Sequence, residues 1–310
     1  MAVTLTEAAK LTQDMLYKGV VEEMLKATPL LQHYPFVEIN GNALTVTRED
    51  VDNMGNTGFV ATGGVLTSSE AKFTQKSFTL YNLYGQADVP GLIQRSQSNI
   101  MDQMAAQVSI KSKLLGYDFE DRAYYGVAAT DEGFDGLHTL VALSSSQMVH
   151  MGTGGVGAPL TIAMLDELYD LVEGGAPDII VMNKKIRRRL SEKLRDSASY
   201  MTERDAYGNY FNVWNEVPII ATDHLLQTED ISGTTYSTPT GGLTSSIFAI
   251  RFGEGDGLCG IQNGGIRTEV FDKLEQYDAA RTRLMWYVGQ ALYGTKALAR
   301  LDGVTNAAMA

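Results

Sequence analysis

Two glycine-rich segments carry the one pattern in this sequence that could bind a nucleotide. Residues 152–157 read Gly-Thr-Gly-Gly-Val-Gly and satisfy G-x-G-x-x-G, whose glycines let the backbone approach a pyrophosphate. A helical pattern and Asp178 follow, but no convincing strand pattern precedes the glycines, and Pro159 stands before the helix. A second match at residues 255–260 has no helix after it. Two matches in a chain with 31 glycines favour glycine-rich loops. A nucleotide-binding α/β enzyme using Gly152–Gly157 is kept as a remote alternative.

The other residues that could do chemistry form no catalytic or metal-binding pattern. The four histidines are scattered, and none belongs to an H-E-x-x-H pair: His33, His138, His150 and His224. Neither a G-x-S-x-G nucleophile elbow nor a G-K-S/T phosphate loop occurs. Cys259, the single cysteine, excludes an intrachain disulfide and is expected to be a buried, unreactive thiol. We therefore predict no catalytic residue, no metal, no cofactor and no enzymatic activity.

Charge is distributed unevenly along the chain. The sequence has 25 Lys and Arg against 37 Asp and Glu, a net charge of −12. That balance disfavours general nucleic-acid binding, because phosphate contacts need a basic surface. Seven basic residues and one acid, Glu192, lie within residues 184–195, so this segment carries +6 and the remainder −18. The segment favours a solvated helix face, or a face that meets an acidic surface of another subunit, over a nucleic-acid patch.

Length and composition are those of a folded protein with one large or two medium domains. The 310 residues are 44% hydrophobic and 20% charged. No window approaches 18 consecutive apolar residues, and the N-terminus lacks the pattern of a signal peptide, so no membrane contact is expected. Residues 6–26 have apolar side chains at helical spacing. They predict a helix that either packs on its own domain or lies on a neighbouring subunit.

A long hairpin and a long helix are predicted next. The β-rich segments 37–48 and 72–89 predict two paired strands. Between them, residues 50–69 have four glycines and no core pattern. This indicates either a disordered surface loop or an arm that orders against another chain. Apolar residues near period 3.6 predict a helix over residues 98–125, about 40 Å long.

The second half of the chain alternates helices with short strands, which predicts an α/β unit followed by further strands. One expected helix spans residues 161–173, and a second follows the N-cap Asn183 and runs through Asp196. The expected strands span 179–182, 217–220, 247–252, 266–271, 281–288 and 291–301.

The order of these parts resembles the major capsid protein of tailed bacteriophages, with its Hong Kong 97-like fold. In both, an amphipathic arm, a long hairpin with a glycine-rich tip, a very long helix, an α/β domain and C-terminal strands follow one another. The stretches that carry the resemblance are Asp14–Glu23 with Pro29–Gln32, Leu165–Leu168 through Pro177–Asn183, Val217–Ile220 with Thr222 and Asp223, and Arg281–Gly289 through Arg300–Gly303. Together they span nearly the whole chain.

The resemblance implies an α+β fold in five parts. These are an N-terminal arm (1–34), an extended loop (35–89), a peripheral domain with the spine helix (90–154), an axial domain (155–262) and C-terminal strands that return to both domains (263–310). It also implies the function of a major capsid protein that assembles into hexamers and pentamers of an icosahedral phage head around double-stranded DNA. An encapsulin-type nanocompartment shell, with the same fold and a protein cargo, is the alternative.

The resemblance further implies partners and a location. The partners are copies of the chain, a portal, a separate scaffolding protein and packaged DNA without sequence-specific contact. Because the sequence begins directly with the arm, the resemblance implies either that separate scaffolding protein or an already mature chain. A decoration protein is a further candidate. The location is the virion capsid, assembled in the host cytoplasm. Some members of the family form Lys–Asn crosslinks, but no constellation here matches one. The candidate inter-subunit contacts are Met15, Val20, Met54, Phe59, Lys72, Lys76, Arg187, Arg188 and Arg189.

Overall fold

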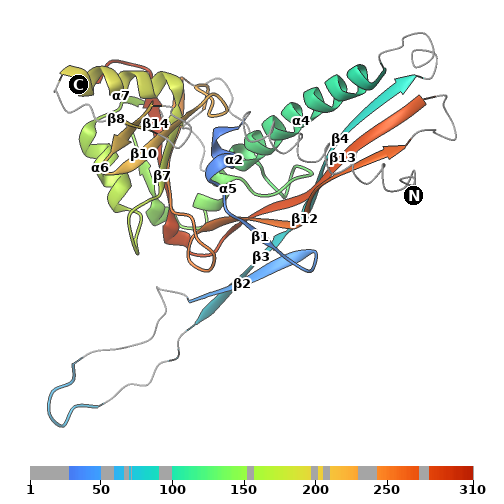
Figure 1. Ribbon diagram of the computed structural model, residues 1–310. Helices are drawn as coiled ribbons and strands as arrows, with labels where there is room; N and C mark the ends of the chain where they lie inside the picture. The colour runs from blue at the N-terminus through green and yellow to red at the C-terminus, as the bar shows by residue number, and fades with distance from the viewer. Residues whose placement is uncertain are drawn as a thin grey trace.

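The computed structural model describes residues 28–49, 59–65, 70, 72–90, 100–151, 157–196, 202–204, 210–229, 243–271 and 279–309. These residues form two sheets with helices packed on them, and a hairpin that projects away from both (Figure 1). The helix predicted over residues 6–26 lies outside the described residues. Because helices and sheets are both extensive, the predicted α+β class is confirmed.

The first sheet has four strands. Their order is β1 (Phe36–Glu38), β12 (Leu258–Phe271), β13 (Ala279–Leu292) and β4 (Tyr81–Pro90). β13 runs antiparallel to both of its neighbours, and β1 runs parallel to β12. The sheet therefore joins segments from both ends of the chain.

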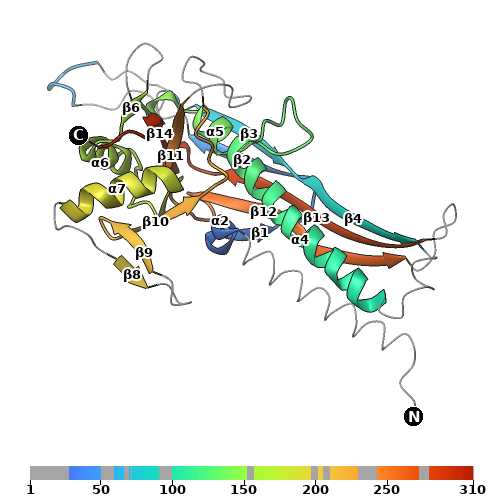
Figure 2. The same cartoon turned by 90° about the horizontal axis from the view of Figure 1, so that it is seen from above.

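A long helix, α4 (Ile100–Tyr125), lies along this sheet and confirms the helix predicted over residues 98–125 (Figures 1 and 2). Its 26 residues correspond to about 39 Å. Val108, Leu115, Phe119 and Ala123 are buried, and their spacing places them on one stripe of the helix. That stripe anchors α4.

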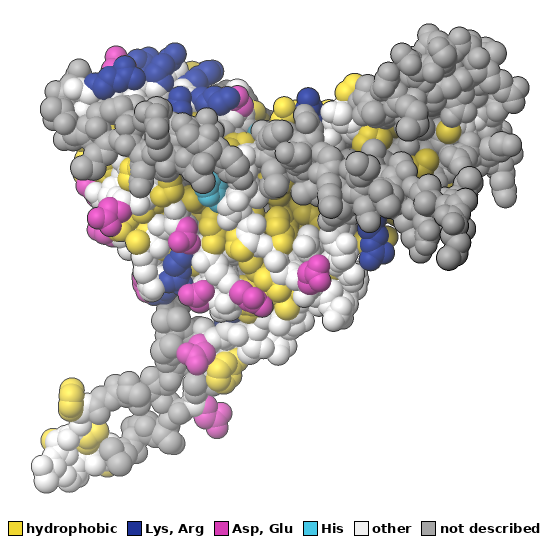
Figure 3. All heavy atoms as spheres, viewed as in Figure 1, with side chains coloured by type: hydrophobic (Ala, Val, Ile, Leu, Met, Phe, Trp, Pro, Cys, Tyr) yellow, Lys and Arg dark blue, Asp and Glu magenta, His cyan; other side chains and the backbone are white. Residues whose placement is uncertain are grey.

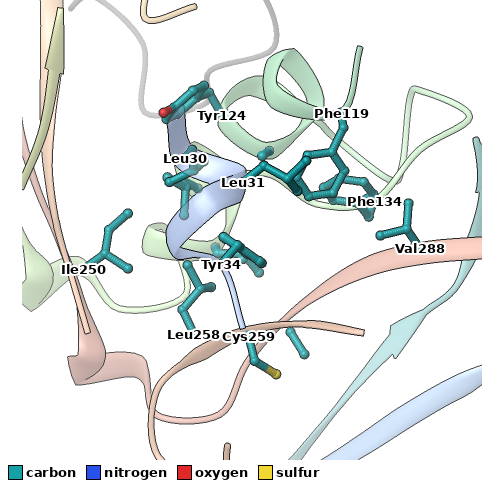
Figure 4. Close-up of a cluster of buried hydrophobic side chains, with 14 of the residues drawn as sticks. Leu30, Leu31, Tyr34, Phe119, Tyr124, Phe134, Ile250, Leu258, Cys259 and Val288 are labelled. Atoms are coloured by element: carbon teal, nitrogen blue, oxygen red, sulfur yellow. The ribbon is translucent and has the colours of Figure 1, made fainter. Parts of the chain in front are cut away.

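Aromatic side chains join α4 to the four-stranded sheet. The ring centroid of Phe119 lies 5.1 Å from that of Trp286 on β13 and 6.0 Å from that of Phe36 on β1. Tyr34, just after the short helix α2 (Pro29–His33), lies 6.1 Å from Phe119. Figure 4 shows Tyr34, Phe119 and Phe134 converging in one buried cluster.

The second sheet has eight strands. Along its main path they are β5 (Met148–His150), β14 (Leu298–Thr305), β11 (Thr244–Ile250), β7 (Ile179–Asn183), β10 (Val217–Thr222), β9 (Tyr210–Trp214) and β8 (Thr202–Arg204), and β6 (Ala158–Pro159) also pairs with β14. Two 3-10 helices, Ser145–Gln147 and Thr295–Ala297, lead into β5 and β14.

Both faces of this second sheet are covered, because alternate residues of a strand point to opposite faces. On β7, Ile180 and Met182 belong to the core that includes α6 (Ile162–Asp170) and α7 (Lys184–Asp196). Ile179 and Val181 belong to the other core, which includes α5 (Leu137–Val141) and the buried stripe of α4. The continuous apolar run of β7 is the sequence pattern of such a doubly covered strand.

The projecting hairpin consists of β2 (Ala43–Glu49) and β3 (Phe73–Thr79), which are paired along their full lengths. The strand predicted over residues 72–89 divides at Leu80, because β4 leaves the hairpin and pairs with β13. β1 and β4 both lie within the range 35–89 predicted for the extended loop, yet both are strands of the four-stranded sheet.

Candidate assembly surfaces

The paired strands β2 and β3 form the anchored base of the hairpin, and the segment that connects them carries exposed apolar residues. Val46 and Phe78 are buried against the main core. Arg48 donates from Nε to the carbonyl oxygen of Tyr293 at 2.7 Å, and its guanidinium lies 5.8 Å from the centre of the Phe78 ring. Toward the tip, Phe59 is fully exposed. A large apolar side chain that packs on nothing in its own subunit is typical of a binding surface.

The tip carries further apolar side chains. Val65 is 88% exposed, and Phe73, the first residue of β3, is 62% exposed. All three apolar residues lie on the tip side of the buried Val46 and Phe78. The hairpin therefore presents an apolar end at a distance from the body of the subunit (Figures 1 and 3).

A groove of about 1010 Å³ runs between α4 and β4. Tyr84 on β4 and Leu114 on α4 line it and are 66% and 46% exposed. Leu226, in the loop after β10, lines it as well and is also exposed. A groove of this size that has exposed apolar side chains on both walls is suited to hold a segment of another chain.

Acidic residues and a histidine line one part of this groove. His224 contacts Asp121 of α4 through Nδ1 at 2.5 Å and lies 3.7 Å from the carboxylate of Glu120 through Nε2. Burial alone would lower the pKa of His224, but the hydrogen bond to Asp121 and the charge of Glu120 raise it. Burial raises the pKa of Glu120, which also accepts a hydrogen bond from Thr222. The contacts of His224 and Thr222 with Asp121 and Glu120 hold α4 against the end of β10.

A second polar cluster, buried except for the partly exposed Tyr125, joins α4 and α5 to the eight-stranded sheet. Glu229 accepts a hydrogen bond of 2.6 Å from the hydroxyl of Tyr125 and another from Ser246 of β11, and it lies 3.2 Å from His138 Nε2. Arg300 of β14 donates to Ser246 at 3.0 Å. Burial alone would raise the pKa of Glu229, but the hydrogen bond from His138 and the charge of Arg300 outweigh burial, so that pKa is lowered. Burial lowers the pKa of His138. Since these groups apart from Tyr125 are closed to solvent, they act as a rigid joint.

The helix α7 presents a basic face. Its buried side consists of Ile186, Leu190 and Leu194. Arg187 and Arg188 are exposed and make no ion pair with any described residue. Asn183 accepts a hydrogen bond from the backbone N–H of Lys185 at 2.8 Å, which confirms it as the predicted cap. In Figure 3 the Lys and Arg side chains gather over α7.

The candidate contact residues lie at separate places. Met15, Val20 and Met54 are outside the described residues. Phe59 and Lys72 are exposed on the projecting segment, and Lys76 of β3 lies 3.7 Å from Asp135. Arg189, unlike its two neighbours, contacts Glu192 at 3.1 Å. The roles of all these residues in assembly stay predictions.

The sequence reasoning missed the groove. Tyr84 and Leu114, which line it, are large apolar residues on exposed surface, and Tyr117, which does not line it, is another. On α4, Leu114 and Tyr117 lie outside the buried stripe. The sequence did contain a signal for this surface, because a helical wheel of α4 places these apolar residues away from the buried stripe.

The glycine motif and the cysteine stay outside these surfaces. Residues 152–156 lie outside the described residues, and the short strand β5 does precede them, contrary to the prediction. β6 follows, and α6 begins only at Ile162 after the cap Thr161, so no helix begins directly at the glycines. Cys259 is buried as predicted, and burial raises its pKa to about 11.

Neither a metal cluster nor a membrane helix is found in the described ranges. No group of three or more His, Cys, Asp or Glu side chains there is arranged to hold a metal ion. No helix of the described part of the chain has the length and apolarity needed to cross a bilayer.

Similar proteins are found at the level of structure. No protein-family model matches the sequence, and no curated protein matches it. The holo-SrpI encapsulin complex from Synechococcus elongatus PCC 7942 is similar with a TM-score of 0.69 and 18% identity, over 91% of this chain and 89% of that chain. The capsid of a native GTA particle is similar with a TM-score of 0.61 and 14% identity, over 90% of each chain.

A phage structure shares the same arrangement. Mycobacterium phage Adephagia is similar with a TM-score of 0.56 and 13% identity, over 90% of this chain and 89% of that chain. In each comparison the match extends over about nine tenths of both chains. The chain therefore has the Hong Kong 97-like capsid fold, in agreement with the resemblance carried by its sequence.

Proposed function

We propose that this chain is a structural shell protein, the major capsid subunit of a phage head. In this role it self-assembles into hexamers and pentamers of an icosahedral shell around double-stranded DNA. The observation that carries the proposal is the fold, which matches capsid and encapsulin subunits over 89–91% of each chain. The net charge of −12 suits a shell that must not bind its packaged DNA tightly, because like charges repel.

The hairpin and the groove support the proposal physically. In the assembled shell, the hairpin of one copy reaches over a neighbouring copy. Phe59 and Val65 become buried against that copy and are no longer exposed to water. The groove lined by Tyr84 and Leu114 is a surface of the kind such a segment needs. Each contact is small, but many copies repeat it, so the whole shell gains stability through multivalency.

The finer assignments rest on the resemblance. They are the arm at residues 1–34, the peripheral domain at 90–154, the axial domain at 155–262, and the return of residues 263–310 to both domains. A portal, a separate scaffolding protein and a decoration protein complete the proposed set of partners. The proposed location is the virion capsid, after assembly in the host cytoplasm.

An encapsulin-type compartment with a protein cargo is the second candidate. It is favoured by the TM-score of 0.69 with the Synechococcus encapsulin, against 0.61 and 0.56 with the GTA and Adephagia capsids. The projecting hairpin together with a separate arm favours the phage head.

Imaging of particles formed by the full chain tests both candidates. We expect purified material to contain closed icosahedral shells by electron microscopy. Shells from the native source that contain nuclease-protected DNA or a portal at one vertex support the phage head. A packaged enzyme would instead establish the encapsulin, and a chain that stays monomeric at high concentration would refute a shell function.

A further inference from the structure

Helix α6 presents an acidic face. Thr161 caps it by accepting a hydrogen bond from the backbone N–H of Met164 at 3.3 Å, and Leu165 and Leu168 are fully buried. On the opposite side, Glu167 and Asp170 are exposed and stand three residues apart, so they are neighbours on the helix surface. Within the described part of the chain, neither carboxylate makes an ion pair. We call these two residues the acidic face of α6.

Helix α7 presents the complementary charge. Lys185, Arg187 and Arg188 are exposed, and none of them has an ion-pair partner in the parts of the chain that the structure describes. Lys184 is already paired with Asp223, and Arg189 with Glu192. We call the three unpaired residues the basic face of α7.

The two faces belong to one rigid layer but do not neutralise each other within the subunit. α6 packs on β14, β11 and β5, while α7 packs on β7 and β10, so they cover different parts of the same sheet. Both share the core that holds Ile180 and Met182. Figure 2 shows the two helices in one layer at the end of the molecule away from α4. The charge pattern is therefore held in place by the fold.

We propose that the basic face of α7 in one copy of the chain binds the acidic face of α6 in another copy. This inference rests on the proposed function, and it names the partner surface of the basic helix. A second copy is favoured over a nucleic acid because the chain outside residues 184–195 carries −18, so a polyanion approaching α7 meets a repulsive surface. A second copy supplies localised carboxylates of opposite charge that can pair with these cations.

The proposed contact is directional. It joins two different patches, as a heterologous interface does, and repetition of such a contact closes a ring when the rotation between copies allows it. Exposed ion pairs are individually weak and are screened by salt, so the contact selects the correct neighbour and orientation rather than supplying most of the binding free energy.

Charge reversal on each face tests the proposal in the full-length chain. The α7 variant combines Arg187→Glu with Arg188→Glu, and the α6 variant combines Glu167→Lys with Asp170→Lys. All four residues are exposed, so the subunits should fold, as circular dichroism would verify. We expect each variant to raise the concentration needed for half-maximal assembly by roughly tenfold, because like charges then face each other. The variant with all four substitutions should return to the wild-type value.

An equal mixture of the two reversal variants provides a second measurement that needs no fourfold variant. In a ring with an even number of copies, such as a hexamer, alternating copies then place opposite charges on every contact, so the mixture should assemble at a lower concentration than either variant alone. The milder pair Arg187→Gln and Arg188→Gln should weaken assembly less than reversal and remove part of its salt dependence.

The outcomes separate this inference from the proposed function. If the reversal variants assemble like the wild type, or if neither the mixture nor the fourfold variant recovers assembly, the α6–α7 contact is wrong while the shell function stands. If wild-type chains form no shell, the proposed function itself fails. Loss of binding to a DNA fragment by the α7 variant, with assembly unchanged, would assign α7 to nucleic acid and overturn the proposal.

Discussion

Arg48, at the base of the projecting hairpin, donates a hydrogen bond of 2.7 Å from Nε to the carbonyl oxygen of Tyr293, which lies 245 residues later in the sequence. The same guanidinium donates to the carbonyl oxygen of Leu292 at the end of β13. Together with the burial of Val46 and Phe78 against the main core, this side chain fastens the hairpin to the four-stranded sheet. This contact makes the base rigid while the tip stays available to other copies.

Replacement of Arg48 by Met should loosen that base. The variant leaves two backbone carbonyl groups without their donor, so we expect the free energy of unfolding to fall by about 1–3 kcal/mol. Cleavage of the hairpin by a protease should also become faster. Urea unfolding and limited proteolysis measure the two effects. Lys72→Ala, on the exposed part of the same segment, is the matched control and should change stability by less than about 0.5 kcal/mol.

Replacement of Phe59 and Val65 by Ser should block assembly without unfolding the subunit. Both side chains are exposed in the isolated chain, so their removal costs the monomer almost nothing. In a shell, however, the apolar area that they bury is lost, at about 25 cal/mol per Å². Deletion of residues 53–67 should have the same effect. Particle yield by electron microscopy is the measurement, and normal shells from either variant would contradict the role given to the tip.

Phe119 and Tyr117 stand two residues apart on α4, but replacement by Ala should destabilise the subunit strongly at Phe119 and only slightly at Tyr117. Phe119 is 1% exposed and contacts Trp286 and Phe36, so Phe119→Ala should destabilise the subunit by about 3–5 kcal/mol. Tyr117 is 42% exposed, and Tyr117→Ala should change the free energy of unfolding by less than about 1 kcal/mol. Chemical denaturation of both variants checks the pair. Equal effects would mean that the buried stripe of α4 has been assigned incorrectly.

His224 should make stability depend on pH. Its pKa is raised in the folded chain, so the protonated ring contributes stability below the pKa of an unfolded histidine, about 6.5. That contribution is lost as pH rises through the raised pKa of the folded chain. The wild type should therefore exceed His224→Gln in unfolding free energy more at about pH 5.5 than at about pH 8.5. Asp121→Asn removes the partner of His224 and should reduce the pH dependence of the unfolding free energy. If the difference in unfolding free energy between the wild type and His224→Gln grew with pH, this account would be contradicted.

Cys259 should be unreactive until the chain unfolds. It is fully buried, and burial raises its pKa to about 11, so little thiolate forms near neutral pH. A thiol reagent should label the protein in denaturant but not under native conditions. Ser77→Cys, combined with Cys259→Ser, places a thiol on the exposed side of β3 and should be labelled in both states. Rapid native labelling of Cys259 would show that β12 opens readily.

The sequence by itself determined the elements whose signal is local. The period of Val108, Leu115, Phe119 and Ala123 determined α4, because a helix buries one stripe of its own surface. The apolar run at 179–182 likewise determined β7, and the order of such elements led to the capsid fold. The excess of basic residues in 184–195 marked α7 as a charged surface.

Only the tertiary structure decided which distant segments meet. Residues 72–89 read as one strand, yet β3 pairs within the hairpin and β4 pairs with β13, because strand pairing depends on partners far away in sequence. The groove beside Tyr84, the contact of Arg48 with Tyr293 and the separate placement of the α6 and α7 charges have the same origin. Each of them depends on how separate elements are placed relative to one another. Periodicity, propensity and charge counts describe each element by itself and contain no information about that placement.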